Sequence, residues 1–338
     1  MGKKITFCGN IIVDSVKTIP SWPEKGMLAQ ITGMKRCVGG SVCNSGVDLK
    51  VLDPSIEVQA LGKVGNDAAG DFAVSLMESK GIDCSRVHRV EGVPTTFTDV
   101  MTVEGTGERT FFNMHGADSR MTPDDVDVGK LDCDIFHLGY LLLLDGLDAP
   151  DAEYGTKAAR LLAKVQAAGV KTSIDIVSEQ SDRFQRIVRP ALRYCDYIVV
   201  NEIEGSMATG LPCRNEDGKV FADALAKIAE ALFVLGVREK VVLHCPEMSL
   251  SRSAEVVTTV VPSLDLPKEW IKGSVGAGDA FCAGMLYSLL SGLPDREGME
   301  LASCVAAANL AAIDSISGAL PLAETLAIGS RFNRRQGK

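Results

Sequence analysis

From residue 134 onward, strand-like and helix-like segments alternate along the chain, and this alternation limits the folds that the chain can adopt. Runs of β-branched and apolar residues predict strands at 135–141, 170–177 and 197–200. Between them, the segments 152–168 and 181–193 predict helices. Such alternation predicts a mostly parallel sheet with helices on both faces, whose ligands bind at the carboxyl ends of the strands. The same kinds of pattern predict further strands at 4–13, 58–62 and 240–245. They also predict helices at 45–52, 280–290 and 299–313, and a further helix that follows the turn at 65–67 and ends at residue 80.

A glycine-rich turn, GSVGAGDAF at residues 273–281, leads into one of these helices. Such a turn leaves backbone N–H groups unpaired at the positive end of the helix dipole, and these groups can bind phosphate oxygens. Asp279 is unusual there, because a carboxylate repels an anion. A base that accepts a proton from a hydroxyl group would explain its presence.

Three interpretations of the turn compete. A nucleotide P-loop would need a lysine where Asp279 stands. A dinucleotide fingerprint would need a third glycine where Phe281 stands, and it normally lies in the first βα unit. The simplest alternative is a tight strand-to-helix turn whose acid complements the helix dipole.

The segment GAGDAF resembles the signature of the ribokinase-like (PfkB) carbohydrate kinases. The resemblance implies a three-layer α/β/α sandwich with a mostly parallel central sheet and a small β-sheet lid. It also implies that Gly276, Ala277 and Gly278 form an anion hole, that Asp279 is the catalytic base, and that Ser274 contacts the nucleotide.

Two N-terminal features resemble the sugar-binding residues of this family. Asp14 follows the first strand, and the segment GGSVCN, residues 39–44, precedes a helix. The resemblance implies that Asp14, Gly39, Gly40 and Asn44 hold the sugar, for which an amide that donates and accepts hydrogen bonds is suited. A turn aspartate and a plain strand–turn–helix junction are the structural alternatives.

The segment NEIE, residues 201–204, stands at the end of a predicted strand and resembles the family motif N-x-x-E. The resemblance implies that Asn201 and Glu204 help to hold Mg²⁺, partly through water, beside the phosphates of ATP. The alternative is a helix N-terminus capped by Asn201 with acids in its first turn. By the same resemblance, Asn309 borders the adenine.

Two β-rich regions outside the alternating part predict the small sheet. They are 16–38, with a β-prone piece at 28–32, and the hairpin formed by 94–104 and 109–115 around residues 105–107. We therefore expect a lid at 15–37 and 93–117, and a large domain at 1–14, 38–92 and 118–338. In the resembled family such a lid often forms a homodimer contact and supplies sugar-binding residues. Arg109 and His115 are candidates for sugar binding here. The alternative is that both are simply exposed polar residues of the hairpin.

Two departures from the family pattern affect the expected cofactors. The family often has T-x-G-x-x-G after the strand at 240–245, but this chain reads HCPEMS at 244–249. The sequence therefore leaves open which nucleotide donates the phosphate. Potassium-activated members carry an aspartate where this chain has Gly273, so dependence on a monovalent cation is doubtful. The neighbouring Lys272 could partly replace such a cation.

Composition excludes several classes of function. The net charge of −9 argues against binding to nucleic acid or to an anionic membrane. We expect a cytoplasmic protein, because the N-terminus resembles no signal peptide and no apolar run has membrane-spanning length. The ten cysteines include no C-x-x-C pair and the four histidines have no compact ligand spacing, so we expect neither disulfides nor structural zinc.

Together these features predict an ATP-dependent sugar kinase that phosphorylates a hydroxyl of fructose, ribose, a keto-deoxy sugar acid or a similar small carbohydrate. A nucleoside kinase of the same family and a non-catalytic sugar or nucleotide sensor remain as alternatives. A dinucleotide oxidoreductase is disfavoured by the failed fingerprint.

Overall fold

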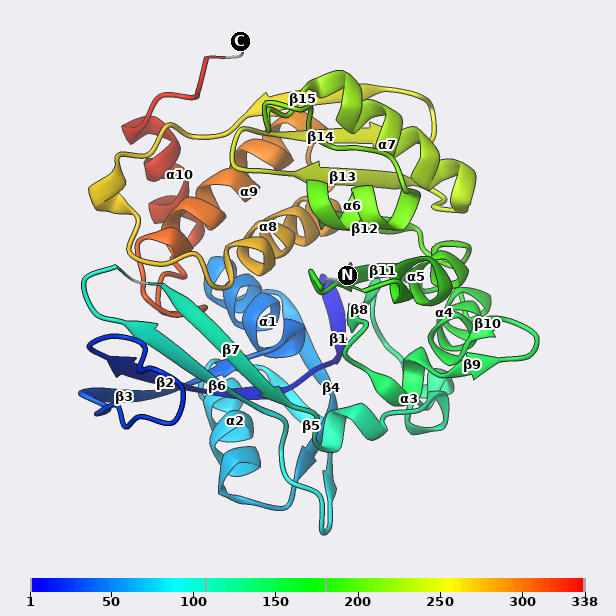
Figure 1. Cartoon of the computed structure of the whole chain (residues 1–338). Coiled ribbons are helices and arrows are strands. Elements are labelled where there is room, and N and C mark those ends of the chain that lie inside the picture. Colours follow the sequence, from blue (N-terminus) through cyan, green and yellow to red (C-terminus); the bar gives the residue numbers. More distant parts are fainter. Residues whose placement is uncertain (1, 107, 180, 337–338) are drawn as a thin grey trace.

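The computed structural model describes residues 2–106, 108–179 and 181–336, and at its centre is a nine-stranded sheet (Figure 1). The strand order is β15-β14-β13-β12-β11-β8-β1-β4-β5. The strands from β13 to β5 are parallel, whereas β14 and β15 add an antiparallel edge. The bounds are β1 (Lys4–Gly9), β4 (Glu57–Gly65), β5 (Asp83–Val90), β8 (Ile135–Leu141), β11 (Lys171–Ile176), β12 (Tyr197–Asn201), β13 (Lys240–His244), β14 (Met248–Ser253) and β15 (Thr258–Pro262).

Helices cover both faces of this sheet, so the predicted three-layer α/β/α sandwich with a mostly parallel sheet is confirmed (Figure 1). One apolar core joins β8, β11 and β12 to α4, α5 and α7; another joins β1 and β4 to α1, α2, α8 and α9. The helices are α1 (Ser41–Leu52), α2 (Ala68–Ser79), α3 (Asp145–Asp148), α4 (Lys157–Ala167), α5 (Arg183–Leu192), α6 (Glu202–Thr209), α7 (Ala222–Leu235), α8 (Ala277–Ser291), α9 (Asp295–Leu310) and α10 (Leu322–Arg331).

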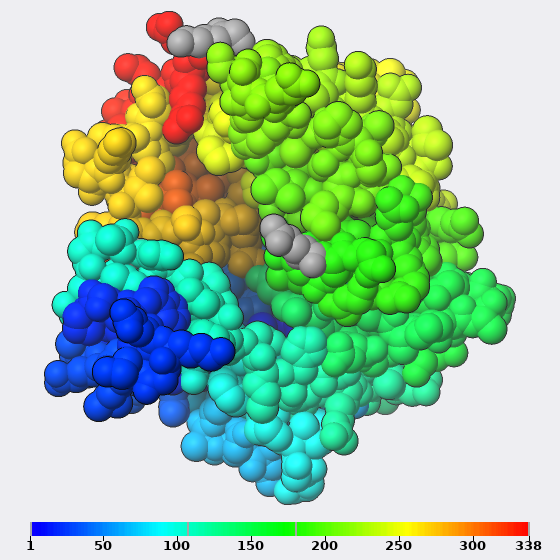
Figure 2. Space-filling model, viewed as in Figure 1, coloured from blue at the N-terminus to red at the C-terminus, as the bar shows by residue number. Residues whose placement is uncertain are grey.

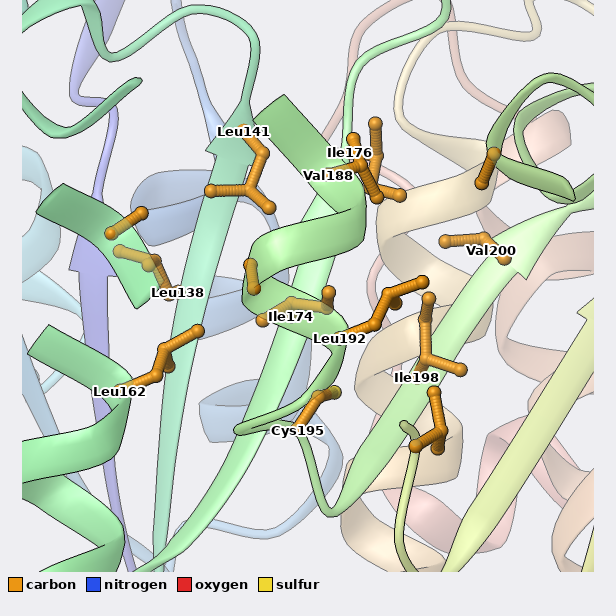
Figure 3. Close-up of a cluster of buried hydrophobic side chains, with 14 of the residues drawn as sticks. Leu138, Leu141, Leu162, Ile174, Ile176, Val188, Leu192, Cys195, Ile198 and Val200 are labelled. Atoms are coloured by element: carbon orange, nitrogen blue, oxygen red, sulfur yellow. The ribbon is translucent and has the colours of Figure 1, made fainter. Parts of the chain in front are cut away.

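The strands that carry the site are fixed by dense packing below it. Leu138, Ile174 and Ile198 come from three neighbouring strands and are fully buried against α4 and α5 (Figure 3). Burying each such side chain stabilises the fold by roughly 1.5–3 kcal/mol. The carboxyl ends of these strands are therefore held on a rigid base.

A separate four-stranded sheet, which we call the lid sheet, has the order β3-β2-β6-β7. Its strands are β2 (Ile12–Ile19), β3 (Gly33–Gly39), β6 (Phe97–Val103) and β7 (Arg109–Met114). The small sheet is thus confirmed, although β2 begins before residue 15 and β3 extends past residue 37. The predicted hairpin of β6 and β7 also forms; Gly107 in its turn lies outside the described residues.

Several predicted elements differ from the structure. The segment 28–32 is not a strand: Leu28 is 96% exposed, and the strand that pairs with β2 begins only at Gly33. The predicted helix at 152–168 begins only at Lys157, because residues 150–156 form the short β9 (Pro150–Asp151) and β10 (Gly155–Thr156) and the Thr156 hydroxyl caps the helix. The strand predicted at 4–13 divides at Gly9, and its second part enters the lid sheet.

A hollow opens between the lid sheet, the region of α8 and α9, and the strands β8, β11 and β12 (Figure 2). It lies over the carboxyl ends of the parallel strands, where ligands were expected. Among the described residues, no helix is long and apolar enough to span a membrane.

Candidate active site

The glycine turn lies at the N-terminus of α8, as predicted. Gly276 is the residue before the helix and has a φ of 78°, a left-handed conformation that glycine adopts without strain. A Cβ on Gly276 would lie 2.6 Å from the Cβ of Ser315, so the close approach of these two segments also requires glycine. The first amides of a helix have no partner within it, although the N–H of Ala277 makes a long bond of 3.4 Å to the carbonyl of Ser274. The turn can thus receive phosphate oxygens.

Asp279 lies in the first turn of α8 and is buried. The Tyr140 hydroxyl donates to its Oδ1 at 2.6 Å, and the Asn44 side-chain amide donates to its Oδ2 at 2.9 Å. The Ser45 hydroxyl donates to its carbonyl oxygen at 3.3 Å. Burial raises the pKa of Asp279, and these donors oppose that rise because they favour the ionised form. The arrangement suits a carboxylate that accepts a proton.

The predicted sugar-binding group comes together beside Asp279. A Cβ on Gly39 would lie 2.6 Å from Asp14 Oδ2, and one on Gly40 would lie 2.4 Å from the carbonyl oxygen of Asn10. Both glycines therefore permit backbone approaches that no other residue would allow. Burial raises the pKa of Asp14 to about 6, although its hydrogen bond to Thr98 opposes the rise.

Further acids surround this place. Asp175 lies near the end of β11 and Glu204 lies in the first turn of α6, and both are buried. Burial and the nearby charge of Asp279 raise the pKa of both, to about 7 for Glu204. Three carboxylates thus converge from different elements, and such a group favours binding of a cation.

Asn201 and Glu204 also form the helix cap that was weighed as the alternative. Asn201 Oδ1 accepts from the Glu204 N–H at 2.8 Å, and Glu204 Oε2 accepts from the Asn201 N–H at 2.9 Å. The Ser178 hydroxyl donates to Glu204 Oε1 at 2.7 Å. A carboxylate oxygen can accept more than one hydrogen bond, so capping leaves capacity for water or a metal. The set of oxygen donors fits Mg²⁺.

A cavity of about 510 Å³ adjoins the turn on the side of α6 and α9. Its lining includes Ser274, Gly278 and Asn201 among the predicted nucleotide contacts, together with apolar side chains such as Ile203 and Leu310. An apolar slot next to an anion site fits a base attached to phosphates.

The unusual loop after β13 borders the same cavity. The rings of His244 and Phe281 lie 4.6 Å apart, and Pro246 lines the cavity. Glu247 forms an ion pair with Arg214 at 2.8 Å, and Arg214 also holds Glu202 at 2.5 Å. The loop is therefore stabilised by an ion-pair network and has no glycines.

Three candidate residues lie elsewhere. Arg109 donates to the carbonyl oxygen of Ile313 at 3.0 Å, and its guanidinium lies beside Gly273. The His115 ring is hydrogen-bonded to Asp145 at 2.9 Å, and both side chains are exposed to solvent. Asn309 is buried inside α9, donates to the carbonyl of Ser315 at 2.7 Å and does not line the nucleotide-side cavity.

Sequence reasoning missed several residues of the site. Asn10 accepts from the Tyr140 N–H at 2.7 Å and donates to the buried Asp118 at 2.9 Å. Tyr140 and Asp175 are the next-to-last residues of the neighbouring strands β8 and β11, so their position near strand ends was the one available signal.

Asp175 also belongs to a buried group of three side chains that could hold a metal ion. One ligand atom each of His137, Asp175 and Cys282 lies within 4.8 Å of the others. Burial lowers the pKa of His137 to about 3, so the imidazole is neutral, and its Nδ1 bonds the Ser173 hydroxyl at 3.0 Å. The three come from β8, β11 and α8, so no spacing in the sequence could reveal them.

Comparisons with known proteins agree with this geometry. A family model described as pfkB family carbohydrate kinase matches residues 3–321. An uncharacterized sugar kinase of Archaeoglobus fulgidus is 24% identical over 253 residues, covering 75% of this chain and 90% of that protein. A 5-dehydro-2-deoxygluconokinase of Clostridium perfringens is 24% identical over 308 residues, covering 88% and 85%.

The fold is shared with ribokinase. The structure of Arabidopsis thaliana ribokinase complexed with ribose and ATP matches with a TM-score of 0.78 and 20% identity, covering 97% of this chain and 99% of that one. At this identity the match supports the ribokinase fold alone, whereas the family match extends over nearly the whole chain. The chain belongs to the pfkB family of carbohydrate kinases.

Proposed function

We propose that this protein is an ATP-dependent kinase that transfers the γ-phosphate to a hydroxyl group of a small carbohydrate. The observation that carries the proposal is the position of Asp279, buried at the start of α8 between the glycine turn and the group formed by Asp14, Gly39, Gly40 and Asn44. A base beside an anion site is what in-line phosphoryl transfer to a hydroxyl requires.

Asp14 and the glycines would hold the sugar, with one hydroxyl directed at Asp279. Asp279 would accept the proton of that hydroxyl as its oxygen attacks the γ-phosphorus and the bond from that phosphorus to the β-phosphate bridge oxygen breaks. The amides of residues 276–278 would stabilise charge on the transferred group. Holding the two reactants in this geometry accounts for much of the rate of such reactions.

The nucleotide would occupy the cavity beside Ser274 and Gly278, with its base among the apolar side chains. Asn201 and Glu204 would hold Mg²⁺, partly through water. When bound, Mg²⁺ neutralises and orients the phosphates. Since ATP and reducing conditions meet in the cytoplasm, the ten unpaired cysteines fit a cytoplasmic site of action.

The acceptor is best sought among small polyols and sugar acids. The curated relatives include a 5-dehydro-2-deoxygluconokinase and a deoxyribokinase of Salmonella typhimurium. The proposal is tested with fructose, ribose, deoxyribose, keto-deoxy sugar acids and nucleosides, each with ATP and Mg²⁺ and with identification of the phosphorylated product. ATP consumption that no acceptor stimulates would contradict it, and a phosphorylated nucleoside as the preferred product would favour a nucleoside kinase.

Asp279→Asn should lower turnover of the identified substrate by roughly 10²–10⁴-fold, which is the usual effect of losing a general base. Asn keeps the size of the side chain and the acceptor for Tyr140, so folding and ATP binding should change little. Steady-state rates, thermal unfolding and ATP titration measure the three quantities. Turnover near that of the wild type would remove Asp279 from the role of base.

A further inference from the structure

Two cationic side chains of the lid sheet contact the segment that follows α9, near the glycine turn. Lys35 on β3 forms an ion pair with Asp314, whose side chain is only 4% exposed. Arg109 on β7 donates to the carbonyl oxygen of the preceding residue, Ile313, at 3.0 Å. Lys35 and Arg109 thus each hold one of two consecutive residues in the segment that follows α9.

An open space lies between the lid sheet and the glycine turn at this end. A cavity of about 580 Å³ separates the lid sheet from the turn, with Val16, Thr18 and Phe111 on one side and Lys272 and Val275 on the other. Lys35, Arg109, Ile313 and Asp314 line the same cavity, and their two contacts bridge the lid sheet and the large domain there. Two polar contacts across a gap can break and form without disturbing either core.

The loop that they hold, residues 312–317, also supports the phosphate turn. A Cβ on Gly273 would lie 2.8 Å from the carbonyl oxygen of Ala312, and Gly276 lies against Ser315. The Ser315 hydroxyl donates at 3.1 Å to the carbonyl of Val38, next to the sugar-binding glycines. One loop therefore connects the lid sheet, the acceptor side and the phosphate turn.

Asp314 fixes the shape of this loop. It accepts hydrogen bonds from the Ser317 N–H at 2.7 Å and from the Ile316 N–H at 3.2 Å. A change in its position would move the residues that lie against Gly276. We propose that Lys35 and Asp314 are positioning residues, whose ion pair sets the phosphate turn in its working geometry when the lid sheet covers the acceptor. The proposal rests on the proposed kinase function and deepens it.

The first experiment measures steady-state kinetics of Lys35→Met and Asp314→Asn. Each should lower kcat by about ten- to a hundredfold with the KM for ATP nearly unchanged, because small displacements of a reacting group have effects of this size. Lys35→Arg should restore most of kcat. The double variant should be no slower than the slower single variant, because both remove one interaction.

Lys17→Met is the matched control. Lys17 pairs with Asp99 at 2.5 Å, and both lie within the lid sheet. Its loss removes an ion pair of the lid sheet without touching residues 312–317, so kcat should stay near that of the wild type. An equal fall in kcat for Lys17→Met and Lys35→Met, or additive effects in the double variant, would overturn the proposal.

Hydrogen exchange gives a readout that needs no acceptor. In Lys35→Met, the amides of residues 272–278 and 312–317 should exchange faster than in the wild type and in Lys17→Met. Unchanged exchange in both segments would overturn the coupling even if the kinase is active. Conversely, faster exchange in a protein that phosphorylates none of the sugars would leave the coupling standing and reject the proposed function.

Discussion

Glu204 shows how one side chain can serve a helix and a cation together. It caps α6 through the Asn201 N–H, and burial raises its pKa to about 7. A divalent cation would favour its ionised form. The capping role explains why the segment 201–204 fits both interpretations of the sequence equally well.

Glu204→Gln should raise the Mg²⁺ concentration for half-maximal rate by about tenfold, while the KM for the sugar stays nearly unchanged. Glutamine keeps the oxygen that accepts from the Asn201 N–H but loses the charge that attracts the cation. The matched control is Glu202→Gln in the same helical turn, because Glu202 is already paired with Arg214. Equal Mg²⁺ dependence in both variants would leave Glu204 with the capping role alone.

Asp48 on α1 is a buried acid of a different kind. Neither of its carboxyl oxygens has a hydrogen-bond partner among the described residues. Burial raises its pKa well above the usual value, and Asp279 and Asp314 raise it further. The folded protein therefore keeps a proton on Asp48 that the unfolded chain releases above about pH 4.

Asp48→Asn should change how stability depends on pH. In the wild type, this group lowers the free energy of unfolding by about 1.4 kcal/mol per pH unit between pH 4 and its raised pKa. The variant lacks this loss, so its stability relative to the wild type should be greater at pH 8 than at pH 5. Urea unfolding at both pH values measures the difference. A constant difference between Asp48→Asn and the wild type would show that Asp48 is ionised in the fold.

Asp67→Asn should show the opposite dependence. Hydrogen bonds to Gly70 and Thr95 outweigh burial and lower the pKa of Asp67, so the stability of this variant relative to the wild type should fall on moving from acid to neutral pH.

At the scale of elements, the sequence predicted the helices and strands whose local residue pattern matches their burial in the fold. The strand at 135–141 is a largely apolar run that is buried on both faces, and the strand at 171–176 lies within the β-prone stretch 170–177 between two predicted helices. The β-prone segment 28–32 formed no strand, because strand formation depends on a partner that the segment itself does not specify.

The site was predictable where it depends on local turns. Gly39, Gly40 and Gly276 stand in short motifs, and each permits a close contact that the structure shows. Tyr140 and Asn10 could not be found, because their roles arise from contacts between residues 130 positions apart. The contact of Arg109 with Ile313 could not be predicted either, because the sequence does not contain the distance from the hairpin to residue 313.

The glycine turn also predicts the response to potassium. Gly273 offers no carboxylate to a monovalent cation, and the guanidinium of Arg109 lies beside it and donates to Ile313. Lys272, the other candidate, is exposed. Potassium should therefore raise the initial rate by less than tenfold relative to a bulky organic cation at equal ionic strength and saturating Mg²⁺.

Arg109→Met extends this test. Its loss frees the Ile313 carbonyl and removes a positive charge beside the turn, so the variant should be slower and should respond more to potassium than the wild type. A wild-type activation of tenfold or more, about 1.4 kcal/mol in the barrier, would show that a cation site exists without the carboxylate. An equal potassium response in both proteins would remove Arg109 from this role.

At the scale of the whole molecule, the two faces of the lid sheet differ in character. Residues alternate between faces along a strand, so Thr18 and Lys35 face the large domain whereas Met34 lies on the other face. On that outer face, Met34 is 74% exposed and Phe112 is 52% exposed. The connection between β2 and β3 adds Trp22, whose ring lies 6.4 Å from that of Phe112, together with the exposed side chains of Met27, Leu28 and Ile31. A cluster of this kind on a globular protein is typical of a contact surface.

We expect this outer face to form a homodimer, which leaves the domain-facing side of the lid sheet free to cover the acceptor. A stable dimer buries about 1,200–2,000 Å² in total, and apolar side chains at its centre dominate the affinity. Met34→Glu combined with Phe112→Glu places two charges there that would lose their water on association, so the double variant should be a monomer at concentrations where the wild type is a dimer. Sedimentation velocity over a range of concentrations measures both states.

Val234→Glu is the control, because Val234 is 83% exposed on α7, far from the lid sheet in the fold, and its variant should associate like the wild type (Figure 1). If the wild type stays monomeric at tens of micromolar, or if both variants associate as it does, the apolar face serves another contact.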